Sequence, residues 1–150
     1  MRLISALLAS LLLLATPALA QPAGDLWQSL LDGNKVYVGG SVTFSGLATL
    51  RHESAGHQNP PVTVLSCADS RVPPELIFNR SLDQLFVIRV AGNVAASFEL
   101  GSIEYAIANG YTRMIVVMGH GNCGAVRAAL SPADPPTPSL VALVQRVRES

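Results

Sequence analysis

Residues 113–126 read RMIVVMGHGNCGAV, a stretch in which an apolar run ends and a histidine and a cysteine follow at once. The β-branched run at 113–119 is typical of a buried strand, and His120 and Cys123 come directly after it. A second apolar run, PVTVLSC at 61–67, ends in the same way at the other cysteine of the chain, Cys67. Both cysteines are therefore expected just past the carboxyl ends of strands.

Strands alternate with helices along the chain, which predicts an α/β fold with a parallel sheet flanked by helices on both faces. A further strand is expected at 84–90, QLFVIRV, ended by AGN at 91–93. Helical spacing and first-turn prolines predict helices in the first half of 25–38, near 47–53, from 73, over 97–110, from 123 and from 140. In the first of these, Leu26, Leu30 and Leu31 are the apolar positions and Gly33-Asn34 is the expected stop. In the helix over 97–110, Ile103, Ala106 and Ile107 share one face.

Parallel strands place their carboxyl ends, and hence their binding sites, at one edge of the sheet. If the strands at 61–67 and 113–119 are neighbours, Cys67, His120 and Cys123 meet at that edge. Two thiolates and an imidazole can hold Zn²⁺ and leave a fourth position open, as in catalytic zinc sites. Asp69 is the candidate for a fourth ligand or an outer acceptor, and Arg71 can pair with it.

The composition is that of one globular domain of 150 residues, with 49% hydrophobic and 13% charged residues. The formal net charge is zero, so no basic surface points to nucleic acid or to an anionic membrane as a partner.

The first 23 residues, MRLISALLASLLLLATPALAQPA, have the pattern of a secretory signal peptide. Arg2 precedes an apolar run at 3–15, and ALA at 18–20 is a cleavage site. The run is shorter than the ~20 residues that span a bilayer, so no stable membrane anchor is expected after cleavage. We expect a signal peptide at 1–20 and an exported domain, periplasmic or secreted, at 21–150.

An exported protein can instead join its two cysteines in a disulfide. A disulfide requires neither His120 near one cysteine nor Asp69 and Arg71 near the other, so these neighbours favour a metal site.

The segments CADSRVPPE at 67–75 and HGNCGAV at 120–126 closely resemble the β-class carbonic anhydrases. The resemblance extends to LFVIRVAGNV at 85–94, GSIEYAI at 101–107 and LLDGNKVYV at 30–38, and covers roughly residues 25–130. It implies one Zn²⁺ per chain held by Cys67, His120 and Cys123, with reversible hydration of CO₂ to bicarbonate and a proton.

The resemblance also implies roles for further residues. Asp69 and Arg71 are similar to the catalytic dyad of the family, in which the aspartate accepts a hydrogen bond from zinc-bound hydroxide or, in some members, closes the site by binding zinc. Gln58, Phe86 and Tyr105 resemble CO₂-pocket residues, the last two acting across a dimer interface. Gly124 resembles a backbone contact near the zinc-bound solvent. A homodimer or homotetramer is implied, and His52 or His57 is a candidate proton shuttle, although a solvated loop histidine is the simpler interpretation.

Members of the family continue beyond the position of Ser150, so the resemblance implies that C-terminal elements are missing here. The alternative to the enzyme is a non-catalytic exported domain of the same fold. In that domain Cys67 and Cys123 are oxidised, or zinc is purely structural.

Overall fold

The structure is a computed structural model that describes residues 22–133 and 135–150. The expected signal peptide at 1–20 lies outside the described residues. No helix among the residues described is long and apolar enough to cross a bilayer.

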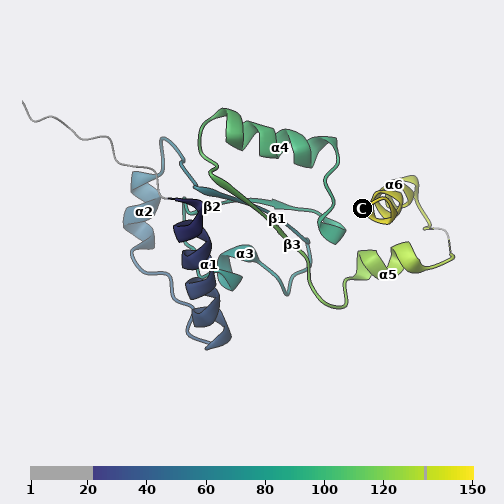
Figure 1. Cartoon of the computed structure of the whole chain (residues 1–150), viewed down its shortest axis with the longest axis horizontal. Helices are drawn as coiled ribbons and strands as arrows, with labels where there is room; N and C mark the ends of the chain where they lie inside the picture. Colours follow the sequence, from purple (N-terminus) through teal and green to yellow (C-terminus); the bar gives the residue numbers. More distant parts are fainter. Residues whose placement is uncertain (1–21, 134) are drawn as a thin grey trace, which may run out of the picture.

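Three parallel strands form the sheet, in the order β2-β1-β3 (Figure 1). They are β1 (Val62–Ser66), β2 (Leu85–Arg89) and β3 (Met114–Met118). The pairing is in register along its whole length, so the last residue of β1, Ser66, lies opposite Arg89 of β2 and Met118 of β3. The expected parallel α/β fold is confirmed, and the strands that end near the two cysteines are neighbours.

Helices lie on both sides of this sheet (Figure 1). Packed on one face are α1 (Ala23–Val38) and α3 (Pro74–Ile77), while α4 (Ser97–Ala108) lies on the other. The 3-10 turn η1 (Ala91–Asn93) follows β2 and packs on α5 (Gly124–Leu130), which in turn packs on α6 (Pro138–Arg148). The short helix α2 (Leu47–Glu53) was expected near 47–53 and is confirmed.

The hydrophobic core lies between the sheet and α1. Leu26 and Leu30 of α1 pack with Val62 and Val64 of β1 and with Phe78 after α3, and all five are buried. Every residue of β1 is buried, as expected for a central strand covered on both faces. This packing fixes β1, and with it the position at which Cys67 leaves the sheet.

The expectation that helices cover both faces of the sheet is wrong for β3. Ile115 and Val117 pair with residues of β1 on the α4 side of the sheet, yet 44% and 63% of their surfaces are exposed. The reason is that α4 packs on β1 and β2, while β3 forms the edge of the sheet. Its other face, including Met114 and Val116, packs against the core.

The expected end of the first helix at Gly33-Asn34 is also wrong, because α1 continues to Val38. A Cβ atom at Gly33 would lie 1.8 Å from the carbonyl oxygen of Phe78, so the glycine allows α1 to approach α3. Asn34 Nδ2 donates to the Ile77 carbonyl at 3.1 Å. Both residues are contact positions rather than a helix stop. Leu31, the third apolar residue expected in this helix, is 36% exposed.

The apolar face expected on α4 is confirmed in part. Ala106 is fully buried, whereas Ile107 is 51% exposed. The part of this face at Ala106 is therefore covered, while the part at Ile107 is open to solvent.

Candidate metal centre

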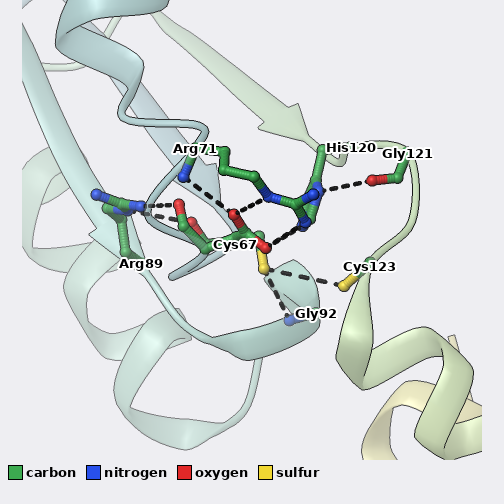
Figure 2. A network of polar contacts seen from close by, with 8 residues as sticks. Cys67, Arg71, Arg89, Gly92, His120, Gly121 and Cys123 are labelled. Carbon is green, nitrogen blue, oxygen red and sulfur yellow. Dashed lines mark hydrogen bonds and ion pairs between the residues drawn. The ribbon is translucent and has the colours of Figure 1, made fainter.

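Three potential metal ligands meet at the carboxyl edge of the sheet. Cys67 is the first residue after β1, His120 is the second after β3, and Cys123 directly precedes α5. Because β1 and β3 are adjacent, their ends bring the three side chains together, and the ligand atoms all lie within 4.8 Å of one another. Figure 2 shows the two sulfur atoms facing each other, with His120 beside them.

The geometry of this cluster fits a zinc ion. Cys67 Sγ and Cys123 Sγ are 3.9 Å apart, and both cysteines are free thiols. Two sulfurs bound to tetrahedral zinc at about 2.3 Å lie about 3.8 Å from each other. Both cysteines are buried, so the sulfurs are shielded from bulk water.

His120 is held with one ring nitrogen available. Its Nδ1 lies 3.0 Å from the Gly121 carbonyl oxygen, which can only accept, so Nδ1 is the donor (Figure 2). Nε2 then carries the lone pair; it is buried and has no hydrogen-bond partner among the described residues. A metal-binding histidine typically has its second nitrogen fixed by a carbonyl in this way. A buried imidazole nitrogen that has no hydrogen-bond partner within the described part of the chain and lies beside two thiols is suited to bind zinc.

The environment of Cys123 favours its thiolate form. Burial by itself would raise the pKa of the Cys123 thiol, but the backbone N–H groups of Val126 and Ala125 at the start of α5, with Cys67, outweigh it and lower the pKa. A lower pKa makes the deprotonated ligand easier to form for a metal.

Asp69 and Arg71 form a tight pair at the rim of the cluster. Arg71 Nε donates to Asp69 Oδ1 at 2.8 Å, Arg71 Nη2 donates to Oδ2 at 2.7 Å, and the Arg71 backbone N–H donates to Oδ1 at 3.0 Å. These hydrogen bonds from Arg71, first from its side chain and then from its backbone, hold the pKa of Asp69 well below its usual range. Asp69 Oδ2 is 3.8 Å from His120 Nε2, so an ionised carboxylate faces the metal ligands.

The pocket residues implied by the resemblance lie elsewhere in the chain. Phe86, near the start of β2, stacks on Tyr105 of α4 with ring centroids 6.3 Å apart. Gln58 is an exposed loop residue next to Asn59, whose N–H donates to Asp83 just ahead of β2. All three residues therefore lie toward the amino ends of the strands. Within one chain the structure does not bring them to the metal ligands.

Gly124 is the first residue of α5 and directly follows Cys123. His52 and His57 are both exposed, and His57 lines a surface hollow together with Asp83. That hollow lies toward the amino ends of the strands, away from the cluster. The structure thus places Gly124 at the site and both histidines away from it.

Two further residues, not predicted from the sequence, contact the site. Arg89, at the end of β2, donates to backbone carbonyls of the loop that carries Cys67, and the Gly92 N–H donates to Cys67 Sγ at 3.4 Å (Figure 2). In the sequence, these residues could have been noticed as the one charged residue inside the apolar run QLFVIRV and as the glycine in AGN, which directly follows that run.

Comparison with known proteins identifies the class of protein. Residues 62–150 match the family described as "Carbonic anhydrase". A carbonic anhydrase of Mycolicibacterium smegmatis is 42% identical over 109 residues, which are 72% of this chain and 53% of that protein. The chain spans about half the length of the curated relatives it matches.

Solved structures give the same result. A Coccomyxa β-carbonic anhydrase in complex with acetazolamide superposes with a TM-score of 0.64 at 30% identity, covering 80% of this chain and 55% of that one. A tetrameric β-carbonic anhydrase of Sordaria macrospora shares the fold, with a TM-score of 0.59 at 24% identity, covering 83% of this chain and 64% of that one. The chain belongs to the β-class carbonic anhydrase family.

Proposed function

We propose that this protein is a zinc-dependent carbonic anhydrase that catalyses reversible hydration of CO₂ to bicarbonate and a proton. The observation that carries the proposal is the meeting of Cys67, His120 and Cys123 beside the Asp69–Arg71 pair. Family membership supports the same reaction.

Zinc is the cofactor that the site chemistry supports. Two buried sulfurs and one imidazole nitrogen suit a borderline-soft ion, whereas Mg²⁺ and Ca²⁺ prefer oxygen ligands. When bound, zinc supplies the Lewis acidity that makes hydroxide available from water near neutral pH. Cys67, His120 and Cys123 would hold the ion and leave the fourth position open.

The Asp69–Arg71 pair would orient the attacking group. The hydrogen bonds from Arg71 keep Asp69 ionised and fix its carboxylate, whose Oδ2 is directed toward the metal ligands. An ionised carboxylate is acceptor-only, so it takes a hydrogen bond from a hydroxyl group and aims the lone pair of that oxygen at the carbon of CO₂. The role of Arg71 is to hold Asp69 in this orientation.

We further propose that the active form is a homodimer or homotetramer. Phe86 and Tyr105 lie toward the amino ends of the strands, away from the cluster of their own chain, so we expect them to line the CO₂ pocket of a second copy. The tetrameric form of the structural neighbour supports this arrangement. The leader-like sequence at 1–20 supports export to the periplasm or outside the cell.

The test combines zinc content with stopped-flow CO₂ hydration on purified protein, prepared with and without reductant. The expected result is about one zinc per chain and hydration well above the buffer rate. Asp69→Asn is expected to retain zinc and lose at least about tenfold in kcat/KM, because the amide cannot reproduce an acceptor-only carboxylate.

Two outcomes would decide against the enzyme. Absence of zinc together with a Cys67–Cys123 disulfide in a peptide map would favour the oxidised, non-catalytic domain. Bound zinc without CO₂ hydration, with the zinc content unchanged in Asp69→Asn, would indicate that the metal is purely structural.

A further inference from the structure

The loop from Cys67 to Arg71 carries a metal ligand and the carboxylate that faces it, so its backbone must be fixed. It leaves the sheet beside the end of β2, where two more backbone hydrogen bonds extend the pairing of β1 with β2. The Val90 N–H donates to Ser66 O at 3.1 Å, and the Ala68 N–H donates to Val90 O at 3.2 Å. Beyond Ala68 the strand pairing ends, and side-chain contacts take over.

Arg89 makes those contacts. Its Nε donates to the Cys67 carbonyl at 3.1 Å, and its Nη2 donates to the Asp69 carbonyl at 2.6 Å. Figure 2 shows its guanidinium on the opposite side of the loop from Arg71. The planar guanidinium presents its donors in a fixed fork, so one side chain sets the spacing of two carbonyls. Arg71 holds the carboxylate of Asp69, while Arg89 holds its backbone.

The segment that follows Arg89 reaches the sulfur itself. The Gly92 N–H donates to Cys67 Sγ at 3.4 Å, and Gly92 has a left-handed φ of 75°. A Cβ atom there would lie 2.9 Å from Val147 Cγ2 of α6 and 3.2 Å from Ala125 Cβ of α5. Gly92 is therefore closely packed, and the segment 89–92 contacts Cys67 at both its carbonyl and its thiol.

We propose that Arg89 is a positioning residue for the metal centre. By holding the carbonyl groups of Cys67 and Asp69, it sets the direction in which the Cys67 sulfur and the Asp69 carboxylate enter the site. This inference rests on the proposed zinc function. Partners that orient metal ligands typically change metal affinity by about 10–100-fold when they are removed.

The experiment compares Arg89→Gln with a matched control, Arg148→Gln. Arg148 also donates from Nε and Nη2 to two backbone carbonyls, those of Ala129 and Ser131, at the carboxyl end of α5. Both variants lose the same kind of contact, and only the first loses it at the metal centre. Arg89→Lys is the second variant, because an ammonium keeps the charge and lacks the fork.

Zinc affinity is measured by competition with a chromophoric chelator, and the cobalt-substituted protein gives the intensity of the thiolate-to-metal charge-transfer band. Arg89→Gln is expected to bind zinc at least about tenfold more weakly and to have an altered band. Arg89→Lys is expected to fall between this variant and the wild type. Arg148→Gln is expected to lower the urea midpoint while leaving zinc affinity and the cobalt band unchanged.

Zinc affinity within twofold of wild type in Arg89→Gln overturns the inference, as does an equal loss in Arg148→Gln. If Arg89→Gln does not fold, wild-type affinity in Arg89→Lys overturns it instead. A wild-type protein that binds no zinc overturns the proposed function as well, which separates the two failures.

Discussion

At the scale of single residues, the Asp69–Arg71 pair has a measurable electrostatic consequence. The hydrogen bonds from Arg71 lower the pKa of Asp69 from its ordinary value of 3.8. A lowered folded-state pKa means that the ionised carboxylate stabilises the native state above about pH 4. This contribution is lost as the pH falls through the folded-state pKa.

Arg71→Gln is therefore expected to raise the pKa of Asp69 toward 3.8 in the metal-free protein, and to remove this part of the stability above about pH 4. The measurement is a carboxylate titration by ¹³C NMR. Arg113→Gln, at the other end of β3, is the control and should leave the Asp69 titration unchanged. An Asp69 pKa that is the same in Arg71→Gln and wild type would contradict the assignment.

Two buried hydroxyl groups of β1 should respond oppositely to removal. Thr63 shares a hydrogen bond with the Thr112 hydroxyl, whereas Ser66 Oγ is buried and has no partner among the described residues. Thr63→Val is expected to lower the free energy of unfolding by about 1 kcal/mol. Ser66→Ala is expected to leave it unchanged or raise it by up to about 1 kcal/mol. Urea denaturation measures both, and an equal loss in the two variants would refute the distinction.

At the scale of elements, the contact between α1 and α3 depends on the absence of a side chain at Gly33. An added Cβ would lie 1.8 Å from a backbone oxygen of Phe78, which cannot move without shifting α3. The two helices must separate to accommodate even one methyl group, and this would loosen the core beneath the sheet.

Gly33→Ala is expected to lower the free energy of unfolding by about 1–3 kcal/mol, because over-packing outweighs the better helix propensity of alanine. Gly24→Ala on the same helix is the matched control, since nothing lies within 4 Å of its added Cβ. That variant should be neutral or more stable. Chemical denaturation at fixed pH measures both, and a Gly33→Ala protein as stable as wild type would show that α1 does not pack this closely.

At the scale of the whole molecule, the candidate metal centre brings together segments that are far apart in the sequence. Cys67 follows β1, while His120 and Cys123 lie between β3 and α5. A zinc ion bound here would tie the central strand to the edge strand and to the helices α5 and α6. Ligand binding of this kind stabilises the folded state, because the unfolded chain has no preformed site.

Zinc at about 1,000 times its dissociation constant contributes about 4 kcal/mol, so chelation is expected to lower the Tm by roughly 10 °C. Thermal denaturation with and without chelator measures the shift. In Cys123→Ser most of this Tm shift should disappear, and adding Mg²⁺ to the chelated wild type should not restore its Tm. A Tm that is insensitive to chelator in a zinc-loaded sample would contradict the proposed site.

The sequence by itself determined the three strands and the residues available to hold a metal at their ends. Apolar β-branched runs predicted the three strands, and the cysteines and histidine just past two of them predicted where the ligands lie. These features are local, because strand and helix formation depend on the spacing of nearby residues. The fold class could therefore be predicted without coordinates, and so could the grouping of Cys67, His120 and Cys123 as residues able to hold a metal.

Only the tertiary structure decided which segments touch. The strand order β2-β1-β3 brings Cys67 and His120 to one edge, and packing against Phe78 turns Gly33 from an expected helix stop into a contact. The partial cover of β3 and the hydrogen bonds of Arg89 likewise depend on residues distant in sequence. The physical reason is that such contacts are set by packing between elements, which the periodicity of one segment does not contain.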